Sequence, residues 1–140
     1  MRFWDSSAIL PLLLHGERSA AAGAALTEDP LQAVWCLAEV ELVSGIARRS
    51  REGLAAEDAA RARSRLEELA DHWREVSAIE SVRRRAVRLL STHTLRAADA
   101  LQLAAALVLS EERPESLSFV CLDDRLREAA RKEGFPVLPS

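Results

Sequence analysis

The sequence predicts a three-layer α/β/α fold, in which a central parallel sheet of four or five strands lies between two layers of helices. Short apolar runs alternate with longer helical segments along the whole chain, and this alternation is typical of βαβ units. A length of 140 residues with 49% apolar content suits one compact domain over residues 1–140 and is too short for two. The 25 alanines, against five glycines and five prolines, favour helix.

In the first half of the chain, proline and glycine mark the ends of the predicted elements. These elements are a strand at 2–5, helices at 6–15 and 17–29, a strand at 31–36, and helices at 37–53 and 55–73. Ser6 or Ser7 is the predicted cap of the first helix, and Pro11 is expected to bend this helix or shift its start.

The second half continues the alternation. We predict a strand at 73–77, helices at 78–93 and 96–112, a strand at 117–122, a helix at 123–134 and a last strand at 135–139. Between Ala97 and Leu109 only Asp99 and Gln102 are polar. A helix that is apolar on nearly every side is buried, so this segment is expected in the core.

Net charge, cysteine positions and hydropathy limit the classes of protein that this sequence fits. The net charge of −3 provides no overall basic field, so nucleic acid would have to be held by a local patch or through bound metal. Cys36 and Cys121 lie far apart in apolar runs, which predicts buried thiols and not a disulfide framework or a zinc site. With no visible signal peptide and no stretch long enough to span a membrane, we expect a cytoplasmic protein.

Two acids follow predicted strands directly. In parallel α/β sheets, ligands bind outside the carboxyl ends of the strands, and this rule places Asp5 and Asp123 at that edge. Each acid also has a structural explanation as the cap of the next helix. Because Asp124 adjoins Asp123, one of the pair can cap the helix while the other faces the edge.

Two further acids lie on helices with apolar faces. Asp99 falls in the first turn of the apolar helix, where burial is costly without a partner, and Gln102 one turn on is predicted to orient it. Glu39 and Glu41 both share a helix face with apolar or small residues, so periodicity does not choose between them.

The four acids together indicate a metal site. Like charges about 4 Å apart repel by roughly 4 kcal/mol at an effective dielectric constant near 20. A cluster of carboxylates therefore needs cations, or raised pKa values, to exist. A site built of oxygen ligands favours Mg²⁺, with Mn²⁺ as a second possibility, over zinc.

The sequence resembles the PIN-domain family, and within it the VapC-like toxin ribonucleases of type II toxin–antitoxin systems. Four segments carry the likeness: Asp-Ser-Ser at 5–7, Glu-Leu-Val-Ser-Gly at 41–45, Leu-Arg-Ala-Ala-Asp-Ala-Leu-Gln-Leu-Ala at 95–104, and Asp-Asp-Arg-Leu at 123–126. This register selects Glu41 over Glu39 and Asp123 over Asp124. One departure is Cys121, where many relatives have Thr or Ser.

The resemblance implies a metal-dependent endoribonuclease that hydrolyses RNA phosphodiester bonds, with Mg²⁺ as cofactor. It implies that Asp5, Glu41, Asp99 and Asp123 are the catalytic and metal-binding residues. It also implies a cognate antitoxin as inhibitor, and a homodimer. Candidate substrate contacts are Ser6, Arg48 and Arg49, although arginines on a helix are commonly only solvated. The alternatives are a housekeeping RNA-processing nuclease of the same fold and a non-catalytic PIN-like binding module.

Overall fold

The computed structural model describes residues 1–14 and 19–140 and shows a five-stranded parallel sheet. The strand order is β3-β2-β1-β4-β5. The strands are β1 (Arg2–Trp4), β2 (Gln32–Trp35), β3 (Arg74–Val76), β4 (Phe119–Val120) and β5 (Val137–Leu138). All of them fall within the runs that the sequence analysis predicted as strands.

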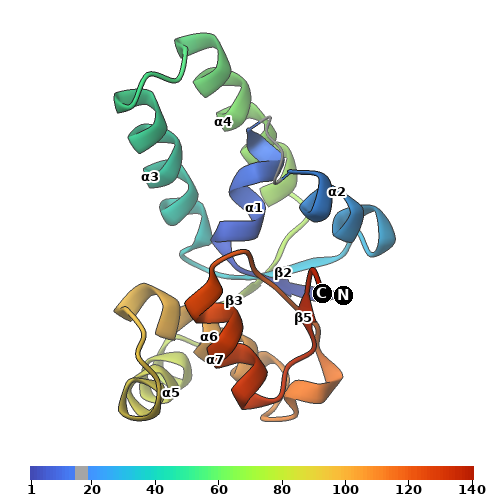
Figure 1. Cartoon of the computed structure of the whole chain (residues 1–140), viewed down its shortest axis with the longest axis vertical. Helices are drawn as coiled ribbons and strands as arrows, with labels where there is room; N and C mark the ends of the chain where they lie inside the picture. The colour runs from blue at the N-terminus through green and yellow to red at the C-terminus, as the bar shows by residue number, and fades with distance from the viewer. Residues whose placement is uncertain (15–18) are drawn as a thin grey trace.

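Helices cover both faces of the sheet (Figure 1). The described residues form helices α1 (Ser6–Leu13), α2 (Ser19–Glu28), α3 (Ala38–Arg51), α4 (Ala56–Ala70), α5 (Ile79–Thr92), α6 (Ala97–Leu109) and α7 (Asp124–Glu133), with a short 3₁₀ helix at Pro114–Ser116. Helices α1 to α4 lie on one side of the sheet and α5 to α7 on the other (Figure 1). The three-layer α/β/α prediction is confirmed.

The sheet separates two apolar cores because successive strand residues point to opposite faces. Phe3 of β1 belongs to the core beneath α5, α6 and α7, and its ring stacks on Phe119 with centroids 5.4 Å apart. Its neighbour Trp4 belongs to the other core, against α1, α3 and α4. Both residues are fully buried, as expected for an inner strand of a parallel sheet.

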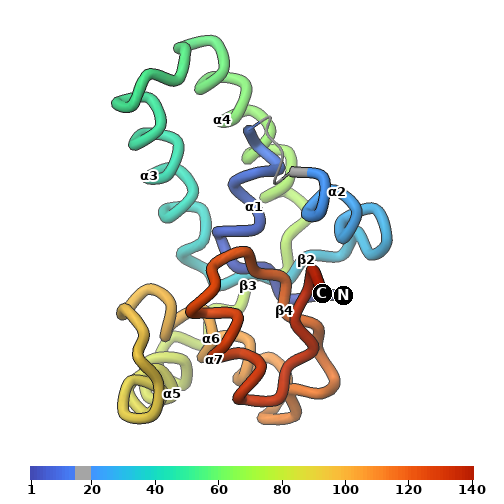
Figure 2. The backbone as a smooth tube through the Cα atoms, viewed as in Figure 1, coloured from blue at the N-terminus to red at the C-terminus, as the bar shows by residue number. Residues whose placement is uncertain are grey.

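Helix α6 lies deep in the first of these cores. Every residue from Leu103 to Leu107 is buried, and so is Gln102. The apolar sequence of this helix predicted its burial correctly. In contrast, α3 and α4 pack against each other as a hairpin that projects away from the sheet, as the backbone trace in Figure 2 shows.

The cap of α1 is one of the three candidates that the sequence offers, Asp5, Ser6 and Ser7. The helix begins at Ser6, and the cap is Asp5, whose side chain accepts a hydrogen bond from the Ser7 backbone N–H, so neither serine has that role. Pro11 lies inside α1, which starts ahead of it. The predicted continuation of this helix to His15, and the first two residues of the predicted helix at 17–29, lie outside the described residues.

The carboxyl ends of β1 and β4 lie side by side at one edge of the sheet. Trp4 pairs with Val120, and the Asp5 backbone N–H donates to the Val120 carbonyl over 2.9 Å. The chain then enters α1 directly after β1, and α7 soon after β4. This edge therefore brings two helix N-termini together.

Among the described residues no helix is long and apolar enough to cross a membrane.

Candidate metal and active site

Asp5 is the most buried acid of this edge, with only 4% of its surface exposed. Its Oδ2 accepts hydrogen bonds from the Ser7 N–H at 3.0 Å and, more weakly, from the Cys121 thiol at 3.6 Å. Burial raises the pKa of the Asp5 carboxyl, the hydrogen bonds from Ser7 oppose that rise, and the charge of Asp99 adds to it. The surroundings of Asp5 therefore compensate the charge of its ionised form only in part.

Glu41 points inward from α3, whereas Glu39 on the same helix is exposed to solvent. The Gln102 amide Nε2 donates to Glu41 Oε1 over 2.8 Å. Burial raises the pKa of Glu41 to about 7, and the charges of Asp5 and Asp99 contribute to the rise. Of the two glutamates that periodicity left open, Glu41 is the one that shares this electrostatic environment.

Asp99 lies in the first turn of α6 and is partly buried. Burial raises the pKa of its carboxyl, and the charge of Asp123 raises it further. Arg96 and Arg125 act in the opposite direction, and both are exposed. Asp99 thus interacts electrostatically with acids from two other elements, α3 and the end of β1, as well as with Asp123.

Asp123 is the exposed acid of the four and caps α7. Its Oδ1 accepts from the Leu126 N–H over 2.9 Å. Asp124 is the first residue of the helix itself. The division of labour expected for this pair is therefore only partly observed, because Asp123 both caps the helix and acts on Asp99 through its charge.

Three helix N-termini support this arrangement. Asp5 caps α1, Asp123 caps α7, and Asp99 lies in the first turn of α6. Backbone N–H groups at a helix N-terminus stabilise negative charge there, by about 0.3–1 kcal/mol for each charge near the surface. The fold thereby gathers carboxylates whose mutual repulsion is compensated only partly.

Gln102 has a role that differs from the one predicted. We expected it to orient Asp99, which shares its helix. Instead Nε2 donates to Glu41 and, over 3.0 Å, to the Ser6 hydroxyl. Gln102 is fully buried, and its Oε1 has no hydrogen-bond partner among the described residues. It ties α6 to α3 and to the start of α1, which positions Glu41 beside the other acids.

Cys121 lies between the two strand-end acids. Its thiol approaches Asp5 Oδ2 and the Asp123 carbonyl, each at 3.6 Å, and the Ser7 hydroxyl at 3.5 Å. Burial raises the pKa of this thiol, so it remains protonated and acts as a weak donor. Cys121 and Cys36 are both free thiols; Cys121 is buried as predicted, whereas Cys36 is only partly buried.

The remaining predicted contacts divide between two places. Ser6 lies within the site, where its hydroxyl accepts from Gln102. Arg48 and Arg49 occupy the last turn of α3, which lies at the projecting end of the hairpin (Figure 2). Arg49 lines a different cavity there, together with Arg61 and Arg65. The structure therefore does not bring these two arginines to the carboxylates.

The donor set fits a hard divalent cation. The cluster offers carboxylate oxygens and the Ser6 hydroxyl, the ligand types that Mg²⁺ and Mn²⁺ prefer. The raised pKa values of Asp5, Glu41 and Asp99 show a deficit of positive charge that a cation would remove. In the part of the chain that is described, no group of three or more His, Cys, Asp or Glu side chains is arranged to hold an ion as it stands.

Comparison with known proteins places this chain in a family. The sequence matches the PIN domain over residues 2–132, so the chain belongs to the PIN-domain family. PIN domains are generally nucleases, which are hydrolases that cleave phosphodiester bonds. The family prediction is thereby confirmed.

A solved structure has the same fold. The crystal structure of PAE2754 from Pyrobaculum aerophilum aligns with a TM-score of 0.61 at 21% sequence identity, covering 91% of this chain and 83% of that one. At this identity the likeness concerns the fold. A comparison with curated proteins found no match.

Proposed function

We propose that this chain is a metal-dependent endoribonuclease and the toxin of a toxin–antitoxin pair. The observation that carries the nuclease proposal is the electrostatic coupling of four acids from four separate elements: Asp5 after β1, Glu41 on α3, Asp99 on α6 and Asp123 after β4. Carboxylates that interact in this way make physical sense as ligands for cations.

In this proposal Asp5, Glu41, Asp99 and Asp123 hold Mg²⁺ or Mn²⁺. The bound ion supplies the acidity that activates a water molecule and the charge that stabilises the oxygens of the phosphodiester. No side-chain nucleophile is required. The four acids thus serve as ligands, or orient the attacking water.

The chain's own residues contribute orientation. Ser7 fixes Asp5 through its backbone N–H, and Gln102 fixes Glu41 through its amide. Both contacts lock a carboxylate rotamer before substrate binds, which lowers the ordering cost during the reaction. Because Glu41 has a pKa of about 7, its carboxylate also gains most from the arrival of positive charge.

The toxin assignment rests on the sequence resemblance to VapC-like proteins. It carries three further proposals: RNA as substrate, a cognate antitoxin as inhibitor, and a homodimer in the cytoplasm. A short reading frame upstream that encodes a DNA-binding antitoxin would support the toxin assignment over that of a housekeeping nuclease.

The test of the nuclease proposal is cleavage of RNA by purified protein with Mg²⁺ or with a chelator. We expect Asp99→Asn to reduce cleavage by more than roughly a hundredfold, since even residues that only support metal ligands cost about 10–100-fold. Glu39→Gln is the control, because Glu39 is an exposed acid that lies on the same helix as Glu41 but outside the acidic site. If Asp99→Asn cleaves at the wild-type rate, the assignment of the metal site is wrong.

A further inference from the structure

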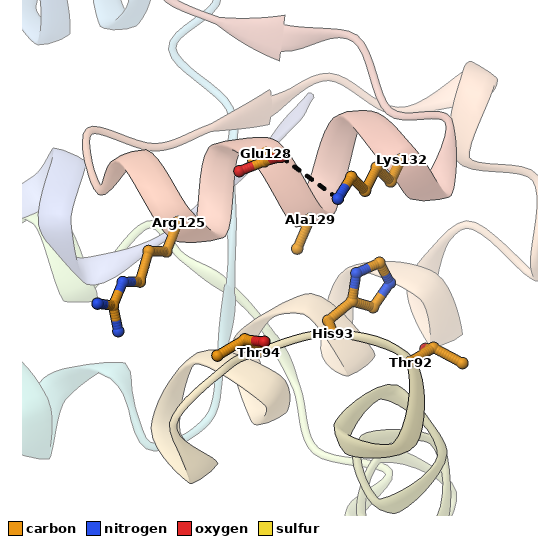
Figure 3. Close-up of a pocket in the computed structure, with 7 residues that line it drawn as sticks. All are labelled: Thr92, His93, Thr94, Arg125, Glu128, Ala129 and Lys132. Carbon is orange, nitrogen blue, oxygen red and sulfur yellow. Dashed lines mark ion pairs between the residues drawn. The ribbon is translucent and has the colours of Figure 1, made fainter.

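A cavity lies between α7 and the segment that connects α5 to α6 (Figure 3). Its volume is about 340 Å³, and it is lined by Thr92, His93, Thr94, Arg125, Glu128, Ala129 and Lys132. Cavities of roughly 300–1,000 Å³ are typical of sites for small ligands. In Figure 3, Arg125 and Thr94 stand toward one end and Lys132 and Thr92 toward the other.

The two segments that line this cavity each adjoin an acid of the carboxylate site. Thr94 immediately precedes the turn that starts α6, the helix that carries Asp99. Arg125 is in the first turn of α7, which Asp123 caps. The charge of Arg125 lowers the pKa of Asp99, so this arginine is in electrostatic reach of the acids. The cavity and the acidic site are therefore neighbours.

The cations of the cavity are available to a ligand. Within the described residues Arg125 makes no hydrogen bond or ion pair, and it is exposed. Among the described residues Lys132 pairs only with Glu128, at 3.3 Å and with both side chains largely exposed, an arrangement that contributes little to stability. His93 is held by Glu133 through its Nε2 at 2.8 Å and forms a fixed wall.

We propose that this cavity is a subsite for one nucleotide next to the scissile bond, and that Arg125 and Lys132, at its two ends, bind the phosphates on either side of that nucleotide. The proposal rests on the proposed ribonuclease function. The exposed Thr94 hydroxyl, which has no partner among the described residues, donates to the phosphate at the Arg125 end or to the ribose. In a chain of net charge −3, a local pair of cations beside four acids is where a polyanion is retained.

Glu128 allows a substitution that is expected to tighten RNA binding. It neutralises Lys132 in the free protein and repels an incoming phosphate. Replacing Glu128 by Gln removes this opposition, so binding becomes tighter. Replacing Lys132 by Ala removes the attraction, so binding becomes weaker. A cavity with no role in RNA binding responds to neither change.

The experiment measures the fluorescence anisotropy of a short labelled oligouridylate, with EDTA present so that binding is observed without cleavage. We expect Lys132→Ala and Arg125→Ala each to weaken binding roughly fivefold to tenfold, and to reduce the slope of log affinity against log salt by about 1. Thr94→Val weakens binding less, and Glu128→Gln tightens it.

Arg131→Ala is the matched control, because Arg131 is an exposed cation of α7 that does not line the cavity. Melting temperatures verify that each variant is folded. The proposal is overturned if Lys132→Ala and Glu128→Gln bind as the wild type does, or if Arg131→Ala weakens binding as much as Lys132→Ala. Cleavage by Asp99→Asn separately tests the nuclease proposal, since that variant is expected to bind RNA without cutting it.

Discussion

The pKa of Glu41, a partly buried acid, reflects the charges of the other acids in the site. Its carboxylate is partly buried and receives one hydrogen bond, from Gln102. That bond stabilises the charged form, yet burial and the neighbouring acids outweigh it, and the pKa rises from 4.5 to about 7. An acid that is this difficult to ionise is a candidate for a functional site.

The first prediction concerns the pH dependence of stability without metal. An acid whose pKa rises on folding binds more protons in the native state than in the unfolded state between pH 4.5 and about 7. The free energy of unfolding therefore falls as pH rises through this range, and Asp5 and Asp99 act in the same direction. Glu41→Gln removes its share, on the order of 1 kcal/mol after screening by water.

Denaturant titrations at steps across this pH range, with a chelator present, measure the effect. We expect Glu41→Gln to be more stable than the wild type above pH 7 and similar to it at pH 4.5. Glu39→Gln, on the exposed face of α3, is expected to keep the wild-type pH dependence. Equal slopes for wild type and Glu41→Gln would show that Glu41 is not under electrostatic strain.

At the scale of elements, two acids have a structural and a chemical task at once. Asp5 caps α1 and Asp123 caps α7, through hydrogen bonds of 3.0 Å and 2.9 Å to backbone N–H groups. One carboxylate oxygen of each is used in this way, and the other is left for a ligand. Capping therefore fixes the position of an acid and leaves one of its carboxylate oxygens available to a ligand.

Asp123 allows the two tasks to be separated. Asn caps helices about as well as Asp, whereas Ala loses about 0.5–2 kcal/mol. We predict that Asp123→Asn keeps the melting temperature near that of the wild type but lowers RNA cleavage. Asp123→Ala is expected to lower both, as thermal melting and a cleavage assay would show. If Asp123→Asn cleaves RNA normally, the residue is only a cap.

Most elements were predictable from local patterns. The runs that became β1, β2, β4 and β5 are rich in apolar residues, whereas β3 has only Val76. Helix α6 revealed its burial by having only two polar residues in its length. The edge position of Asp5 and Asp123 followed from the rule for parallel sheets. These features are visible in sequence because they depend on neighbours along the chain.

The missed features depend on contacts between distant segments. Gln102 lies three residues after Asp99, which suggested a contact within the helix, but its amide reaches Glu41 across 61 residues of sequence. The sequence leaves the α1 cap open between Ser6, Ser7 and Asp5 because Ser and Asp both cap well, and only the backbone geometry at Asp5 decides between them. The 3₁₀ helix at Pro114–Ser116 was not predicted either.

For the whole molecule, the distribution of charge matters more than its sum. A net charge of −3 would repel RNA, and the acidic cluster strengthens that repulsion locally. Divalent cations would offset the negative charge of the site, while Arg125 and Lys132 provide positive charge alongside it. Binding of RNA and binding of metal are thus expected to strengthen each other, although Arg125 and Lys132 allow RNA to bind without metal.

This interdependence leads to the prediction that Mg²⁺ or Mn²⁺ raises the melting temperature. An ion that binds only the native state stabilises it by about 2.7 kcal/mol at a hundred times its dissociation constant, which is roughly 5–10 °C for a domain of this size. The shift should be larger above pH 7 than below, because the acids must lose their protons to bind an ion. Thermal melting with and without metal measures it, with Asp99→Asn expected to lose most of the shift and Glu39→Gln to retain it. A melting temperature that does not change with millimolar metal at any pH would contradict a shared cation site. The acids come from elements on both sides of the sheet, so an ion that they share would stabilise more than one element.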